Sequence, residues 1–145
     1  MLKKLFFLFI LISLSAVVHA QSGRSVLDFN QNWTFNLGDE PNGQNVDFND
    51  ASWRKLNLPH DWSIEGEFKQ ENPATVEGGA LPGGIGWYRK TFTIPQTDKG
   101  KLIYIAFDGV YQKSDVWING HHLGYRPNGY ISFRYELTPY LNYGG

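Results

Sequence analysis

The sequence contains no cysteine, and its acidic and basic residues nearly balance at a formal net charge of -1. The absence of cysteine excludes a disulfide framework, a thiolate zinc site and a cysteine nucleophile. Without a basic excess there is no sign of a nucleic-acid surface, and an aromatic content of 16% argues against disorder. Beyond the N-terminal segment no apolar run is long enough to cross a bilayer. The 145 residues therefore allow one folded domain at most, without membrane or nucleic-acid partners.

Residues 1–20 differ from the rest of the chain. Lys3 and Lys4 are followed by an apolar stretch over 5–12, and small residues precede Gln21. This order predicts a signal peptide that is cleaved after Ala20. A buried or membrane-spanning helix is the alternative, but the unbroken apolar run is shorter than the ~20 residues that a bilayer requires. We therefore expect export to the periplasm or out of the cell, and a folded domain over 21–145.

The strongest local pattern is a β-hairpin in the last third of the chain. Alternating runs at 116–118 and 123–125 flank Asn119 and Gly120, which suit a type I′ turn because both of its central residues need positive φ. A further strand is expected over 130–135. Residues 137–141 predict a short helical turn that Thr138 caps and that Pro139 begins.

Earlier segments also alternate as antiparallel strands do. Over 27–37, Trp33, Phe35 and Leu37 share one face. Trp53 is expected in the core, and 87–94 predicts another strand. Residues 102–107 are apolar on both faces, which predicts a central strand buried between layers. With loops at 38–50 and 64–85, six or seven strands fit an all-β antiparallel sandwich.

Several ordered motifs resemble the N-terminal sugar-binding domain of family 2 glycoside hydrolases, the family of β-galactosidases, β-glucuronidases and β-mannosidases. They are LPHDW at 58–62, GIGWYRKTF at 84–92, FDGV at 107–110, VWING at 116–120 and the 133–141 run. The resemblance implies a jelly-roll β-sandwich of the galactose-binding type, with its last strands beyond residue 145. It also implies that the catalytic glutamates lie on a later (β/α)8 barrel of the same polypeptide.

Candidate catalytic groups within the chain are weak. Glycoside hydrolysis needs two carboxyl groups roughly 5 to 9.5 Å apart, and the glutamates of the 64–85 loop cannot be held so in a mobile, solvated loop. His60 and Asp61 are adjacent, so a strand would point them to opposite faces, and a structural use is favoured. His121 and His122 are expected at a solvated hairpin tip. We therefore predict no catalytic residue, no metal site and no cofactor in this segment.

Sugar binding is the better hypothesis, because pyranose rings stack on aromatic side chains while amides and carboxylates bind the hydroxyls. The loop-borne Trp62 and Tyr125 are candidates, as are Trp87, Tyr111 and Tyr130, whereas Trp33, Trp53 and Trp117 fit core positions. The resemblance implies two loops that reach the substrate, at Gly83 and at Asn128. The predicted substrate-binding residues are Asn128, Tyr125, Arg126, Asp61 and Trp62.

The motifs at 58–62 and 81–88 favour galactosidase-like members of the family. The resemblance thus implies a domain that supports the barrel of an exported enzyme acting on terminal β-galactosides and lends a loop to its sugar pocket. A free-standing carbohydrate-binding module is the alternative, and a purely structural interaction domain is the third.

Overall fold

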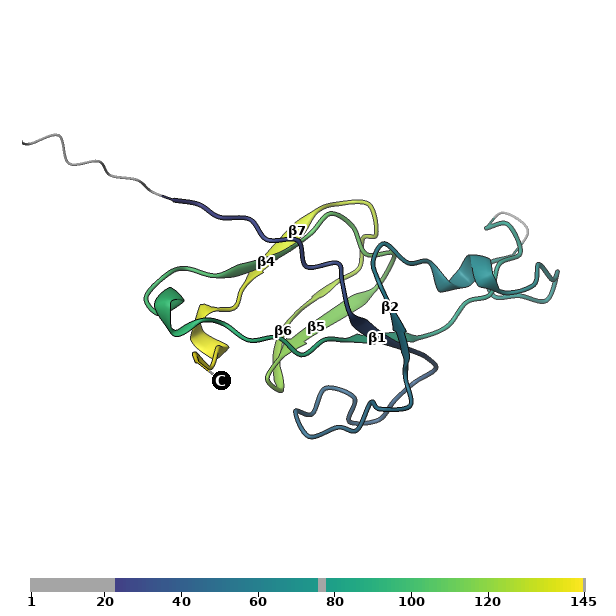
Figure 1. The fold of residues 1–145 in the computed structure, drawn as a ribbon. Coiled ribbons are helices and arrows are strands. Elements are labelled where there is room, and N and C mark those ends of the chain that lie inside the picture. The colour runs from purple at the N-terminus through teal and green to yellow at the C-terminus, as the bar shows by residue number, and fades with distance from the viewer. Residues whose placement is uncertain (1–22, 76–77, 145) are drawn as a thin grey trace, which may run out of the picture.

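The computed structural model describes residues 23–75 and 78–144, so the predicted signal peptide and Glu77 lie outside the described residues. The described chain is built of antiparallel β-strands joined by loops and three short 3₁₀ helices, with no α-helix in these ranges (Figure 1). The elements in order are β1 (Trp33–Leu37), β2 (Arg54–Leu56), η1 (Trp62–Glu65), β3 (Gly86–Arg89), η2 (Gln96–Asp98), β4 (Tyr104–Phe107), β5 (Ser114–Ile118), β6 (His121–Arg126), β7 (Phe133–Glu136) and η3 (Thr138–Tyr140). They form a three-stranded sheet in the order β2-β1-β3 and two strand pairs, β4-β7 and β5-β6.

The three-stranded sheet contains the best-buried part of the molecule. Phe35 in the centre of β1 is only 5% exposed, and Trp53 just before β2 is also buried, as the alternating pattern predicted. Leu37 was expected on the same face but is 54% exposed. The pairing explains this, because β2 accompanies β1 only from Trp33 to Phe35, leaving the end of β1 without a neighbour on that side.

The β5–β6 hairpin has the predicted turn. Asn119 has φ 48° and Gly120 has φ 79°, so both central residues adopt the positive φ that a type I′ turn requires. The register shifts between Val116 and Trp117, which marks a bulge in β5. The hairpin is therefore determined largely by local sequence.

The prediction of a fully buried strand at 102–107 is wrong. β4 pairs with β7 alone among the described strands, and Leu102 just before it is 71% exposed. A strand with one neighbour keeps one edge and part of one face in solvent, whatever its apolar content. The predicted cap is also wrong: Leu137 precedes η3, and the Thr138 hydroxyl instead accepts a hydrogen bond from the Ile103 amide at 2.8 Å. Pro139 does lie at the start of η3, as predicted.

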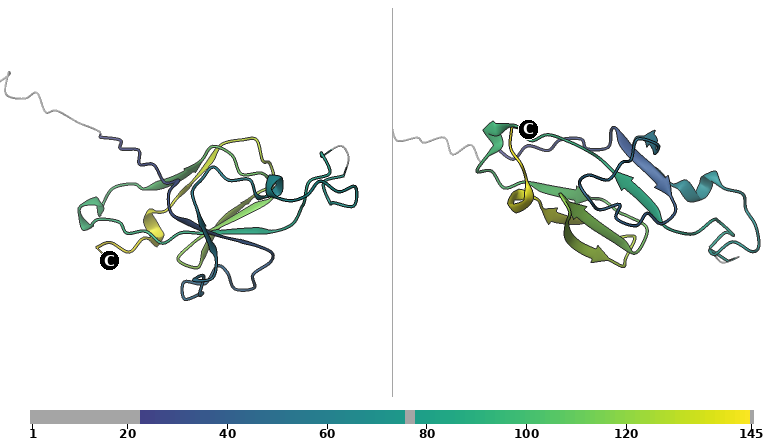
Figure 2. Two further views of the ribbon diagram at one scale, coloured as in Figure 1. Left: turned by 45° about the vertical axis from the view of Figure 1, so that its right-hand side comes forward. Right: turned by 90° about the horizontal axis from the view of Figure 1, so that it is seen from below.

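Side chains connect the three sheets into layers, which Figure 2 shows from two further directions. Trp87 of β3 stacks on Trp117 of β5, with ring centroids 5.5 Å apart. Behind β6, a Cβ on Gly124 would lie 2.9 Å from the ring of Tyr135, so only glycine lets β6 approach β7 this closely. The antiparallel all-β architecture is confirmed.

Candidate functional site

Asp61 and Trp62, two of the predicted substrate-binding residues, lie at the start of η1. The Asp61 carboxylate caps this helix, because its Oδ1 accepts hydrogen bonds from the Ser63 amide at 3.0 Å and the Ser63 hydroxyl at 2.6 Å. Trp62 lies against the sheet: a Cβ on Gly86 would be 2.8 Å from its Nε1 and 3.1 Å from the Phe35 ring. Glycine at position 86 therefore makes room for the indole.

Trp62 lines an open cleft of about 520 Å³ beside β1 and η1. Its walls combine aromatic rings with polar and charged groups, and the lining residues are Phe35, Asn36, Leu37, Ser52, Arg54, Trp62, Glu65, Gly66 and Pro82. A volume within the range of ~300 to 1,000 Å³ and mixed walls of this kind suit a small polar ligand.

A polar network centred on His60 fixes one side of this cleft. The His60 side chain is 11% exposed, and its Nδ1 lies 2.8 Å from the Tyr88 hydroxyl. Its Nε2 lies 2.6 Å from Arg54 Nη2, which also donates to Glu65 at 2.8 Å. The same Nε2 also lies 3.2 Å from Glu65 Oε1, so Arg54 and Glu65 meet at one edge of the imidazole. The network thus joins β2, β3 and η1 through one imidazole.

This arrangement shifts two pKa values. The Arg54 guanidinium hydrogen-bonded to Glu65 holds the pKa of that carboxyl below its ordinary value, so Glu65 is an anion at neutral pH. Burial raises the pKa of Tyr88 to about 12, so its phenol stays neutral. Neither group can exchange a proton with a substrate near neutral pH, which fits a positioning role rather than acid or base catalysis.

Tyr125, Arg126 and Asn128 form a second group, at the end of β6 and in the loop that follows. Arg126 places its guanidinium over the rings of Phe133 and Tyr135, at 5.3 and 5.6 Å. Asn128 Oδ1 accepts a hydrogen bond from the Tyr130 amide at 2.8 Å, and among the described residues the side-chain NH₂ of this exposed residue has no hydrogen-bond partner. Tyr125 is half exposed.

Two tyrosines flank this loop in solvent. Tyr130 is 85% exposed, and its ring meets that of Tyr111 edge to face at 5.5 Å. The five predicted residues therefore lie in two groups on different elements, one at η1 and one after β6. Gly83, the other position implied by the resemblance, is exposed and packs close to Pro73.

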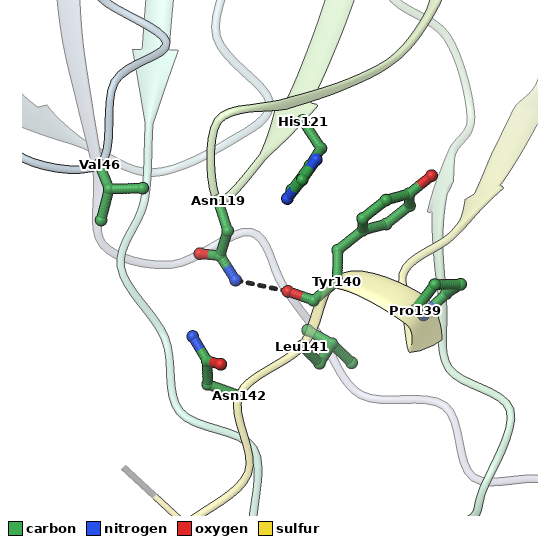
Figure 3. A pocket seen from close by; sticks show the side chains of 7 residues that line it. All are labelled: Val46, Asn119, His121, Pro139, Tyr140, Leu141 and Asn142. Atoms are coloured by element: carbon green, nitrogen blue, oxygen red, sulfur yellow. Dashed lines mark hydrogen bonds between the residues drawn. The ribbon is translucent and has the colours of Figure 1, made fainter.

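A third feature was not predicted as a site. An open pocket of about 390 Å³ lies where the turn of the β5–β6 hairpin meets η3 (Figure 3), and it is lined by Val46, Asn119, His121, Pro139, Tyr140, Leu141 and Asn142. The Asn119 side chain donates to the Tyr140 carbonyl at 2.6 Å, and the His121 ring lies 4.9 Å from the Tyr140 ring. His122 instead bonds Asp115, at 2.7 Å.

Neither the His60 network nor this pocket was predicted from the sequence. Arg54 and Tyr88 are far apart in the chain, and the pairing of β1 with both β2 and β3 brings them together. Glu65 was expected to be solvated; it is exposed, and it also pairs with Arg54 and lies 3.2 Å from His60. Within residues 23–75 and 78–144, no three His, Asp or Glu side chains gather as a metal site would require. A search of the same residues also found no helix with the length and hydropathy to cross a bilayer.

Comparison with known proteins shows which family this chain belongs to. Residues 26–145 match the sugar-binding domain of glycosyl hydrolases family 2. The chain belongs to this family. A beta-galactosidase of Bacteroides ovatus, BoGH2A, is 58% identical over 122 residues, which are 84% of this chain and 14% of the relative. A beta-glucuronidase of Formosa agariphila is 37% identical over 128 residues, covering 88% of this chain and 13% of the relative.

A solved structure supports the same assignment. The crystal structure of a beta-glycosidase from Bacteroides vulgatus superposes with a TM-score of 0.80 at 56% identity, over 83% of this chain and 16% of that chain. The chain thus spans about one seventh of the length of these family 2 relatives, and it corresponds to their N-terminal sugar-binding domain. The family resemblance drawn from the motifs is confirmed.

Proposed function

We propose that this chain is the N-terminal jelly-roll domain of an exported family 2 enzyme that hydrolyses terminal β-galactosides. The observation that carries the substrate class is the 58% identity to a protein named as a beta-galactosidase. The catalytic glutamates belong to a barrel later in the same polypeptide, and the domain supports that barrel.

Within this function, the loop after β6 contributes to the sugar pocket. The exposed amide of Asn128 donates to a substrate hydroxyl, with Tyr125 and Arg126 beside it. Trp62 lines a second approach to the sugar, with the indole as a stacking surface and the cleft beside it as room for the ring, while Asp61 caps the helix that carries it.

A pair of substitutions tests Asn128 in the full-length enzyme. Asn128→Ala removes both the turn bond and the amide donor, and we expect kcat/KM for a nitrophenyl β-galactoside to fall by roughly 5- to 150-fold, which corresponds to about 1 to 3 kcal/mol. Asn128→Asp keeps Oδ1 for the Tyr130 amide but loses the donor. A loss in both variants supports contact through the amide donor, because the carboxylate can only accept from a sugar hydroxyl. Unchanged kcat/KM in Asn128→Ala would overturn substrate contact by Asn128.

A glucuronidase parent is the second candidate, because the Formosa agariphila relative named beta-glucuronidase also aligns over most of the chain. Parallel assays of the full-length protein with nitrophenyl β-galactoside and β-glucuronide decide between the two. Hydrolysis of the glucuronide alone would overturn the galactosidase proposal.

The intact mass of the native secreted protein tests two proposals together, that the protein is exported and that a catalytic barrel follows this domain in the same polypeptide. A mass several times the 16.6 kDa of this sequence, with an N-terminus at Gln21, supports both. A secreted mass near that of 21–145 would favour the free-standing binding module instead.

A further inference from the structure

The pocket between the hairpin turn and η3 lies at the opposite end of β6 from Asn128. His121 begins β6, whereas Arg126 ends it, and six residues of strand span about 20 Å. The pocket therefore uses none of the residues assigned above to the sugar pocket of the enzyme.

The polar side chains of this pocket have hydrogen-bonding capacity that contacts within the protein do not fill. The hydrogen bond from Asn119 to the Tyr140 carbonyl holds one amide, whose oxygen and second N–H have no partner among residues 23–75 and 78–144. In the described part of the chain, neither the Asn142 amide nor the His121 imidazole makes a hydrogen bond to another residue. Figure 3 shows both amides facing the same open space, with the His121 ring above them and Val46 across from it.

The chemistry of these groups selects an uncharged, hydroxyl-rich ligand. Each amide offers both a donor and an acceptor, which matches a pair of neighbouring hydroxyl groups. The His121 and Tyr140 rings, tilted by 31° to each other, offer an aromatic surface, and no Asp, Glu, Lys or Arg lines the pocket to bind or require a charge. Its volume of about 390 Å³ lies within the range of small-ligand sites, ~300 to 1,000 Å³.

We propose that this pocket is an accessory binding site for one neutral pyranose unit, separate from the hydrolytic site. Asn119 and Asn142 bind vicinal hydroxyls, and His121 accepts or donates a further hydrogen bond while its ring packs on Tyr140. In an enzyme acting on oligosaccharides or polysaccharides, such a site would hold part of the chain away from the bond that is cleaved. The inference goes beyond the proposed galactosidase activity and applies equally to a glucuronidase parent.

The experiment titrates the full-length protein with D-galactose, D-glucose and sodium D-glucuronate, and follows saturation transfer to each sugar by NMR. The test variant carries His121→Ala and Asn142→Ala. The control is His122→Ala, because this neighbour bonds Asp115 instead of lining the pocket. We expect roughly tenfold weaker binding of glucose in the double variant, from the loss of two hydrogen bonds, and no change in the control. Galactose should keep its binding at the separate hydrolytic site in both variants.

A second measurement is made on the wild-type protein, and a variant is needed only to assign the His121 ring resonance. This resonance should shift when glucose is added. Equal glucose binding in the double variant and the wild type overturns the proposal, as does an equal loss in His122→Ala or an absence of glucose binding in the wild type. Selective binding of glucuronate also overturns it. Failure here is distinct from failure of the proposed function, which is read from hydrolysis by Asn128→Ala at the other end of β6.

Discussion

The two ends of this domain that carry predicted sugar-binding residues are built differently. At η1, one imidazole contacts groups from β2 and β3 and lies 3.2 Å from Glu65 of η1, and the Phe35 ring lies behind it at 4.9 Å. After β6, the loop is held by a turn bond from Asn128 and by contacts between two largely exposed tyrosines. The first end is cross-linked by specific polar bonds, whereas the second presents aromatic surface to solvent. We therefore expect substitutions around the His60 network to lower stability and substitutions in the exposed loop to leave it nearly unchanged, and the following predictions test this difference.

The largest effect is expected at Phe35. Phe35→Ala removes a ring that is 5% exposed, and a cavity of this kind costs about 3 to 5 kcal/mol. The matched change Tyr130→Ala, at a ring 85% exposed, should alter stability by less than about 0.5 kcal/mol. Hydrogen exchange of the β1–β3 amides in the full-length protein measures both. Similar protection in the two variants would contradict the contrast between the two ends.

Tyr88→Phe should have a smaller effect, because it removes only the hydroxyl bonded to His60. We expect a loss of about 1 kcal/mol at neutral pH. The raised pKa of Tyr88, about 12 against an ordinary 10.0, means that the folded state favours the neutral phenol. This contribution is complete below pH 10 and is lost as pH rises toward 12 and beyond. The stability advantage of the wild type over Tyr88→Phe, measured by the same exchange method, should therefore shrink as pH rises above 10. A constant difference across that window would contradict the assignment.

The smallest effect is expected at Glu65, because this carboxylate is partly exposed. Its lowered pKa means that the folded state favours the charged form, so its contribution is present above the ordinary value of 4.5 and disappears as pH falls through the lowered pKa. Glu65→Gln should be slightly less stable than the wild type at neutral pH and equal to it in strong acid. Glu67→Gln is the control, because Glu67 pairs only with the exposed Lys69. A pH-independent difference would argue against the ion pair with Arg54.

The features that could be predicted from the sequence are those that depend on residues close together in the chain. The hairpin at Asn119 and Gly120 and the buried Phe35 and Trp53 depend on local turn chemistry and on strand alternation. The exposure of β4 could not be read this way, because burial depends on which strands pair with it and not on its own apolar content.

The candidate site was predicted only in part, for the same reason. The residue types at Trp62 and Asn128 suggested sugar contact, and the geometry leaves both available to a ligand. The network of Arg54, His60 and Tyr88 has no local signature, since each residue lies on a different segment. Arg126 was predicted to bind substrate, and its position over Phe133 and Tyr135 has no local signature because it depends on where β7 lies beside β6.

The strand pairs are nested along the chain, and this has a consequence for how fast each can form. β5 and β6 are adjacent, the β4–β7 pair encloses that hairpin, and β1 must reach β3 across the two long loops. Chain closure costs more entropy as the intervening segment lengthens, and forming the inner pair shortens the segment that the β4–β7 pair must close. The hairpin can therefore bring β4 and β7 together early. The sheet of β1 to β3, and with it the His60 network, forms later because the segment between β1 and β3 is the longest that must close.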